Sequence, residues 1–188
     1  MDLVASVLAA LLTLHPGGTE ATRRDAVEGI VAAATEAPLW PAAPGDDAHA
    51  EVLATALVLA AIGQHESSFD PRVGDCHVRG GGAISYYQLL GRFSYHGHEE
   101  SEICRSPALA AKLALRLLHL HKTRCKRCAP AAWLAAYASG DPAKPSRASK
   151  ATARLVDRLA KTSHVVLNVQ ADRVPVWERG FPREDERP

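Results

Sequence analysis

The chain has 188 residues, of which 47% are hydrophobic and 23% charged, and its formal net charge is +1. These values are typical of a soluble globular protein with a substantial core. Because the charges nearly cancel and are mixed in sign along the chain, we expect no nucleic-acid partner. Ala and Leu carry most of the apolar content and aromatic residues make up only 5%, which favours an α-rich fold.

The N-terminus begins with an apolar stretch over residues 3–14, which predicts a short helix that Pro16 ends. Asp2 stands where a signal peptide would carry Lys or Arg, and no small-x-small cleavage site follows, so a signal peptide is doubtful. The stretch is also too short to span a membrane, and we expect no integral membrane segment.

A second helix, capped by Thr19 or Thr22, is expected to run to about Ala37. The ten residues that follow contain three prolines and a glycine and therefore predict a linker. We accordingly expect N-terminal helices and a Pro-rich linker over 1–45 and a main domain over 46–165. The remaining residues, 166–188, turn to Arg, Glu, Asp and Pro, and we expect this C-terminal extension to be partly disordered.

The most informative segment is an almost entirely apolar run that ends at Glu66. The run over 52–66 is rich in Ala and Leu and too long for a typical strand, so it predicts a helix that is buried nearly all the way round. Pro71 requires this helix to end shortly after Glu66. The carboxylate would then be partly desolvated and lie at the negative end of the helix dipole, and both effects raise its pKa. A carboxylic acid of this kind can donate a proton near neutral pH.

The second half of the chain predicts three more helices. Residues 70–97 are rich in Gly, Tyr, His and Ser and indicate either loop or a small β element. Ser106-Pro107 begins an amphipathic helix, Pro130 opens another over 131–139, and a last one is expected over 147–162. The predicted fold is thus a single, mostly α domain with a small loop-rich or β element between the Glu66 helix and the later helices.

Four cysteines, Cys76, Cys104, Cys125 and Cys128, allow three disulfide pairings. Cys104 and Cys125 flank the helix that starts at Ser106, whose ends would lie roughly 25 Å apart, too far for a disulfide. We therefore favour Cys76–Cys104 with Cys125–Cys128 over Cys76–Cys125 with Cys104–Cys128. A zinc site that uses Cys125 and Cys128, or free buried thiols, are the alternatives. Disulfides would indicate an oxidising compartment. We expect no metal.

Three short sequence patches follow one another along the chain. They are Glu-Ser-Ser-Phe-Asp-Pro over 66–71, Gly-Ala-Ile-Ser-Tyr-Tyr-Gln-Leu over 82–89, and Ala-Ala-Tyr-Ala-Ser-Gly over 135–140. Their order and spacing resemble the soluble lytic transglycosylase family, which has a lysozyme-like fold. That family shows Glu-Ser-x-Phe-x-Pro at the end of a buried helix, then Gly-Ala-x-Gly-Leu-Met-Gln, then Ala-Tyr-Asn-Ala-Gly. The resemblance covers roughly residues 50–140. Ser-Tyr-Tyr replaces Gly-Leu-Met, and Ala138 stands where the family has Asn.

The resemblance implies cleavage of peptidoglycan glycan strands between N-acetylmuramic acid and N-acetylglucosamine, with a 1,6-anhydro product and no cofactor. Glu66 would protonate the glycosidic oxygen and then, as a carboxylate, take the proton from the sugar's C6 hydroxyl. Gln88 would bond near the reacting sugar and Tyr137 would place its hydroxyl near Glu66. Ser67 would brace the loop after Glu66.

Two further expectations come from the residues themselves and from the substrate. Tyr86 and Tyr87 could supply faces on which sugars stack, an inference from residue type and not from the family pattern. Because peptidoglycan lies outside the cytoplasm, a periplasmic, extracellular or phage-associated setting is expected, and we expect a monomer.

Two alternative functions stay open at this stage. The first is a lysozyme-type hydrolase on the same fold, in which Asp70 or Asp75 would position water. The second is a catalytically inactive peptidoglycan-binding or assembly protein, for which the substitutions at Tyr86, Tyr87 and Ala138 leave room.

Overall fold

The computed structural model describes residues 2–15, 20–40, 48–78, 81–124, 134, 136–137 and 147–162. Within these ranges the regular elements are helices and there are no strands, so the prediction of a mostly α fold is confirmed. In chain order the helices are α1 (Leu3–Leu14), α2 (Glu20–Glu36), α3 (Ala48–Ser67), α4 (Pro71–Gly74), α5 (Gly91–Tyr95), α6 (Glu100–Arg105), α7 (Pro107–Arg124) and α9 (Arg147–Thr162).

The first helix begins and ends on side-chain hydrogen bonds. The Asp2 carboxylate accepts hydrogen bonds from the first-turn amides of Val4 and Ala5, at 3.0 and 3.3 Å, which satisfies donors that a helix N-terminus leaves free. At the other end, the buried Arg23 of α2 donates to the carbonyls of Leu11 and His15 at 3.4 and 2.7 Å. The guanidinium therefore holds the C-terminus of α1 against α2.

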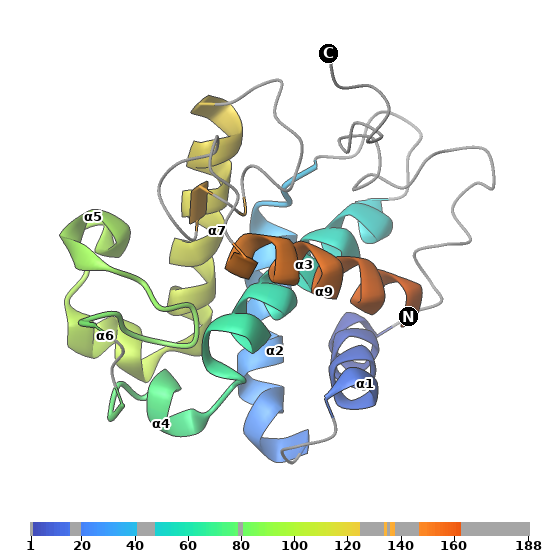
Figure 1. Cartoon of the computed structure of the whole chain (residues 1–188), viewed down its shortest axis with the longest axis horizontal. Helices are drawn as coiled ribbons and strands as arrows, with labels where there is room; N and C mark the ends of the chain where they lie inside the picture. Colours follow the sequence, from blue (N-terminus) through green and yellow to red (C-terminus); the bar gives the residue numbers. More distant parts are fainter. Residues whose placement is uncertain are drawn as a thin grey trace.

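Helix α3 is the centre of the structure (Figure 1). Its twelve consecutive residues from Leu53 to Gln64 are all buried, so the prediction of a helix buried all the way round is confirmed. Helices α2 and α9 make the most extensive contacts with α3, and α1 and α7 add to them. Apolar side chains of α1 and α2 belong to the same core as those of α3. The boundary expected near residue 45 therefore does not separate two cores.

The residues after α2 are fixed between α3 and α7. The amide of Leu39 donates to Thr55 Oγ1 of α3 at 2.8 Å. From α7, His119 Nε2 lies 3.0 Å from the Ala37 carbonyl oxygen, and Lys122 donates to the Leu39 carbonyl. The start of the predicted linker is therefore packed against the domain, whereas residues 41–47 lie outside the described ranges.

The segment between α3 and α7 differs most from the sequence prediction. The expected loop or small β element over 70–97 contains turns and a single bridge, but also the short helices α4 and α5, and the short helix α6 follows it. The only extended pairing in the described part is a single antiparallel bridge between Ile84 and Leu89, with hydrogen bonds of 3.0 and 2.9 Å. Helices of four to six residues are too short to produce a periodic hydrophobic pattern, which is why the sequence did not predict them.

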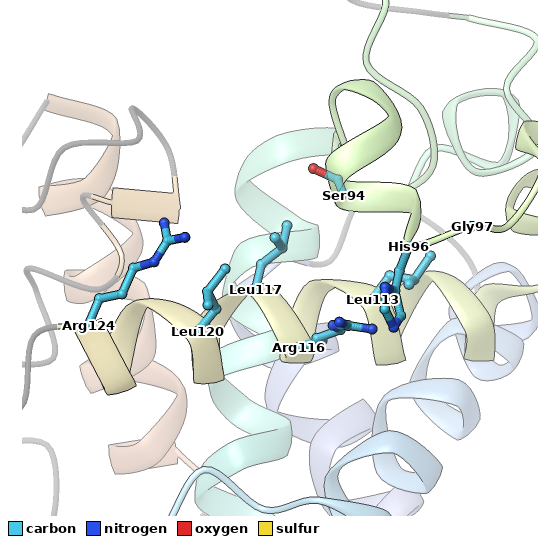
Figure 2. A pocket seen from close by; sticks show the side chains of 8 residues that line it. All are labelled: Ser94, His96, Gly97, Leu113, Arg116, Leu117, Leu120 and Arg124. Carbon is cyan, nitrogen blue, oxygen red and sulfur yellow. The ribbon is translucent and has the colours of Figure 1, made fainter.

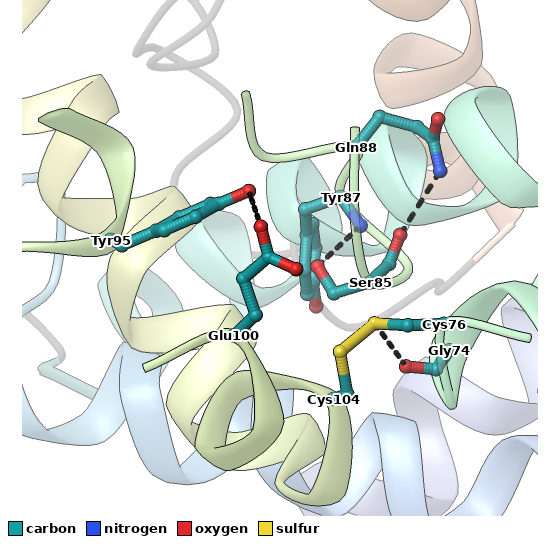
Figure 3. The surroundings of a disulfide bond; sticks show 8 residues. All are labelled: Gly74, Cys76, Ser85, Tyr87, Gln88, Tyr95, Glu100 and Cys104. Atoms are coloured by element: carbon teal, nitrogen blue, oxygen red, sulfur yellow. Dashed lines mark hydrogen bonds between the residues drawn. A yellow bond between two sulfur atoms is a disulfide. The ribbon is translucent and has the colours of Figure 1, made fainter. Parts of the chain in front are cut away.

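A disulfide joins Cys76, just after α4, to Cys104 of α6 (Figure 3). Its Cα atoms are 5.5 Å apart, and it is the first of the two bonds in the favoured pairing. Both sulfurs are used in this bond, so neither is a free thiol or a zinc ligand. Cys125 and Cys128 lie outside the described residues. Among the helices of the described part, none combines the length and apolar character needed to cross a membrane.

Replacing both Cys76 and Cys104 by Ser should lower the free energy of unfolding. The bond closes a loop over a sequence separation of 28 residues, and in the chain-entropy model such a loop contributes about 3–4 kcal/mol. Urea unfolding of the oxidised wild type and of the double variant measures the difference. A difference in the free energy of unfolding below about 1 kcal/mol would contradict the expected stabilisation by this disulfide.

Candidate active site

Glu66 lies in the last turn of α3, where the buried part of the helix meets the surface. Its side chain is partly buried, and this desolvation raises the pKa of the carboxyl above its ordinary value near 4.5. The neighbouring His65 acts in the opposite direction and is the smaller influence. The site therefore favours a protonated carboxylic acid at higher pH than a free glutamate would allow.

The turn after Glu66 has an unusual backbone that Ser67 stabilises. Ser68 and Phe69 both adopt left-handed conformations, with φ of 54° and 55°, which are uncommon for residues other than glycine. The Ser67 hydroxyl donates to the Gly63 carbonyl at 2.8 Å and accepts a bond from the Phe69 amide at 3.1 Å. Ser67 thus braces the loop after Glu66, the role that the family resemblance implied for it.

Two glycines allow aromatic rings to pack beneath this turn. A Cβ atom on Gly63 would lie 2.6 Å from Cζ of Phe69, and a Cβ on Gly74 would lie 2.3 Å from Cζ of Tyr86. The rings of Phe69 and Tyr86 contact each other, with centroids 5.5 Å apart and planes tilted by 56°. These contacts were not predicted from the sequence, although a glycine inside an apolar helix can indicate that another group packs closely against the helix backbone.

The second patch forms a tight turn that presents Gln88. Ser85 and Gln88 have φ of 65° and 49°, and the bridge between Ile84 and Leu89 closes the turn. The side-chain amide of Gln88 donates to the Ser85 carbonyl at 3.2 Å, and the Tyr87 amide points to Ser85 Oγ at 3.4 Å. Figure 3 shows the Gln88 amide oxygen directed away from the turn. Gln88 is only partly buried.

The third patch is tied to the second by Tyr137, whose hydroxyl donates to the Tyr87 carbonyl oxygen at 2.8 Å. Burial raises the pKa of the Tyr137 phenol well above its ordinary value, and the charge of Glu66 raises it further. Because Glu66 acts on this phenol by its charge, the two groups lie within electrostatic reach. Tyr137 therefore joins the third patch to the second, and the ring contact between Phe69 and Tyr86 joins the first patch to the second. Ala138 lies outside the described residues.

The prediction that Tyr86 and Tyr87 offer faces for sugar stacking is wrong. Only 7% of Tyr86 and 1% of Tyr87 is exposed, and both rings belong to the apolar core. Burial raises the pKa of both phenols. Both rings fill the core beneath the turn.

The interactions described for Asp70 and Asp75, the aspartates suggested by the sequence, are with residues other than Glu66. Asp70 accepts a bond from the Arg72 amide at 2.9 Å as the N-cap of α4 and pairs with its guanidinium at 2.7 Å, which lowers the pKa of Asp70. Asp75 acts by its charge on Tyr86. Among the described residues, no carboxylate raises the pKa of Glu66 by its charge.

Within the described ranges, no group of three His, Cys, Asp or Glu side chains is placed to bind a metal ion. No protein-family model, no curated protein and no solved structure matches the chain.

Gly63→Ala should destabilise the protein, although alanine normally stabilises a helix interior relative to glycine. The new methyl group would meet the Phe69 ring at 2.6 Å, and overpacking of this kind costs about 1–3 kcal/mol. Urea unfolding of Gly63→Ala, Phe69→Leu and the double variant gives the coupling between the two positions. If the two substitutions change the free energy of unfolding additively, the Phe69 ring does not pack against Gly63 as described.

Glu66→Gln should change how stability depends on pH. A carboxyl whose pKa is raised by folding binds its proton more tightly in the folded state, so wild-type stability falls as pH rises from about 4.5 through the folded pKa. Glutamine lacks this titration. The melting temperature of the variant relative to wild type should therefore increase between pH 4 and pH 7, and a constant difference would contradict the raised pKa.

Proposed function

We propose that the chain is a lytic transglycosylase of lysozyme-like fold that cleaves peptidoglycan glycan strands. The observation that carries this proposal is the partly buried Glu66, whose pKa is raised and whose charge acts on Tyr137. The first sequence patch contacts the second through the rings of Phe69 and Tyr86, and the third contacts the second through the Tyr137 hydroxyl, which supports the proposal. This arrangement supports one reaction centre with one acid.

The proposed reaction uses the Glu66 carboxyl twice. In the first step the carboxylic acid donates its proton to the glycosidic oxygen between N-acetylmuramic acid and N-acetylglucosamine, and the bond from that oxygen to the anomeric carbon breaks. In the second step the resulting carboxylate takes the proton from the C6 hydroxyl of the muramic acid residue. The C6 oxygen bonds to the anomeric carbon, which gives the 1,6-anhydro ring and consumes no water. The proton on Glu66 is thereby restored, so one carboxyl suffices.

The neighbouring residues have positioning roles in this proposal. The Tyr137 hydroxyl already donates its proton to the Tyr87 carbonyl, so it fixes the Gln88 turn relative to Glu66 and is not a proton donor to substrate. Gln88 keeps its amide oxygen free of the turn and is partly accessible, which suits a hydrogen bond to a sugar hydroxyl or amide. Ser67 holds the turn that ends α3.

The lyase is favoured over a lysozyme-type hydrolase because the hydrolytic routes need a second carboxyl. Inverting enzymes place it roughly 6.5–9.5 Å from the first and retaining enzymes about 5–5.5 Å. Asp70 is occupied by Arg72, and Asp75 acts on Tyr86. The interactions described for these two carboxyls do not involve Glu66, which supports the reaction that uses one carboxyl.

The proposed setting is outside the cytoplasm, where peptidoglycan lies. The Cys76–Cys104 disulfide supports this because such bonds persist in oxidising compartments and are rare in the cytosol. Periplasmic, extracellular and phage-associated sites all fit that chemistry.

Digestion of purified peptidoglycan, followed by mass spectrometry of the released muropeptides, tests the proposal. The wild type should release 1,6-anhydro products, which are lighter by one water than reducing-end products. Glu66→Gln should lower their yield by at least about 100-fold, the usual scale of general acid–base catalysis. Glu28→Gln, which removes an exposed carboxyl on α2, is the matched control and should leave the yield unchanged.

Two other results would contradict the proposal. Reducing-end products that depend on Glu66 would establish a hydrolase. Binding of peptidoglycan without any product from the wild type would establish a non-catalytic protein.

A further inference from the structure

The charges of the whole chain nearly cancel, but they are not evenly distributed along the sequence. Residues 105–161 contain thirteen Lys or Arg residues and two acidic residues, which gives this stretch a formal charge of +11. Residues 1–104 contain five Lys or Arg residues and fourteen acidic residues, a formal charge of −9. Charge that is separated in this way produces a local field, and the positive stretch can attract a polyanion.

Helix α9 presents part of this positive charge as a single line. Its sequence contains five Lys or Arg residues, one acidic residue and no aromatic residue. Arg147, Lys150, Arg154 and Arg158 are exposed and follow one another at intervals of three or four residues. On an α-helix these positions fall within an arc of about 80° and extend over about 16 Å of the axis. We call this line of side chains the basic stripe.

The opposite side of α9 is packed in the core. Thr152, Leu155, Val156 and Leu159 are buried, and the helix lies across α3 and also contacts α1 (Figure 1). Because these apolar side chains are used in packing, they are not available to enter a lipid bilayer. A partner that binds the outward side of α9 therefore contacts the basic stripe.

Three residues of the basic stripe have their charged groups available for a ligand. Within the part of the chain that the structure describes, Arg147, Lys150 and Arg154 form no ion pair. A guanidinium has a planar set of donors that matches the oxygens of a phosphate, and a lysine binds phosphate as a point charge. The stripe is therefore suited to a ligand that carries phosphates.

The arrangement of the charges indicates that this ligand is a chain. Neighbouring residues of the stripe are separated by roughly 4.5–6 Å along the helix axis, so a linear polymer can place successive phosphates beside successive side chains. Because α9 has no aromatic residue, it lacks the stacking surface on which single-stranded nucleic acids bind. The basic stripe fits best a flexible polymer of small alcohols joined by phosphodiesters.

We propose that the basic stripe of α9 is a docking surface for the polyol phosphate polymers of bacterial cell walls. The choice of this polymer rests on the proposed function, since such polymers occur in walls together with peptidoglycan. Their phosphates bind Arg147, Lys150 and Arg154. The stripe holds the protein on the wall and takes no part in the proton transfers at Glu66.

Fluorescence anisotropy of a labelled poly(glycerol phosphate) chain measures this binding. The wild type should bind the polymer at low salt, and Arg147→Gln/Lys150→Gln/Arg154→Gln should bind at least about tenfold more weakly. With three phosphate contacts, the slope of log affinity against log salt should be about −2 in the wild type and close to zero in the variant. Gln has nearly the same helix propensity as Arg and Lys, so α9 should stay folded.

The matched control is Arg105→Gln/Arg116→Gln/Arg124→Gln, which changes the net charge by the same amount. These arginines are exposed, but they do not form a continuous line. Arg105 ends α6, and Figure 2 shows Leu117 and Leu120 between Arg116 and Arg124 along a pocket on α7. The control should bind the polymer within about twofold of wild type. An equal loss in the control would attribute binding to net charge and overturn the docking surface.

Other anions test the choice of partner. Vesicles of phosphatidylglycerol and phosphatidylcholine, a single-stranded oligothymidylate and poly-glutamate each compete with the labelled polymer in the same assay. Tighter binding of any of these at equal concentration of negative charge would overturn the proposal. It would assign the stripe to a membrane, to nucleic acid or to acidic polypeptides, respectively. No binding of the polymer by the wild type would overturn the docking surface itself.

Sedimentation with purified walls separates this inference from the proposed function. Glu66→Gln is mixed with walls that carry polyol phosphate, or with the same walls after hydrofluoric acid has removed that polymer. More protein should sediment with the untreated walls, and adding the three stripe substitutions should abolish the difference. Equal sedimentation of Glu66→Gln with both walls would overturn the inference. Because this readout is binding, it is independent of whether the wild type releases anhydro products.

Discussion

The burial of α3 is the constraint on which the rest of the site depends. Helices on several sides exclude water from twelve consecutive residues of α3, and the helix approaches the surface in its first five residues and again in its final turn. Glu66 lies in that turn, so its carboxyl is placed where water is partly excluded while a substrate can still reach it. The partial burial of the carboxyl at the helix end raises its pKa.

The backbone around Glu66 is held in place by contacts that reach across the chain. Five residues between Ser68 and Gln88 have positive φ without being glycine, a conformation that costs free energy at each position. Their neighbours hold them: the Ser67 hydroxyl, the packing of Phe69 on Gly63, and the disulfide at Cys76. Strain of this kind clusters where a chain fixes functional groups, and here it surrounds the proposed acid and Gln88.

Periodicity and breakers were sufficient to predict the long helices. The expected bounds of α1 and α9 agree with the structure within a residue or two, and Pro71 limits the C-terminal end of α3 as expected, whereas α3 begins at Ala48, four residues before the predicted apolar run. The pair Cys76–Cys104 followed from the length of α7, a purely geometric argument. The Tyr137 hydroxyl bonds to the Tyr87 carbonyl, so the third motif lies against the second, whereas the roles of Glu66, Gln88 and Tyr137 in a reaction stay predictions.

Other features depend on contacts between distant residues, and the sequence could not predict them. Helices α4, α5 and α6 are too short for a hydrophobic period. The directions of Tyr86 and Tyr87 are set by space that Gly74 and the core provide, so two aromatic residues that suggested a sugar platform are buried.

The central claim is that Glu66 is an acid of raised pKa at the end of a buried helix. Its most direct test is an NMR titration of the Glu66 side-chain carboxyl carbon in the wild-type protein, assigned by comparison with Glu66→Gln. The account predicts a midpoint clearly above the ordinary value of 4.5. A midpoint at or below that value would show a solvated carboxylate and would contradict the role of Glu66 as the acid.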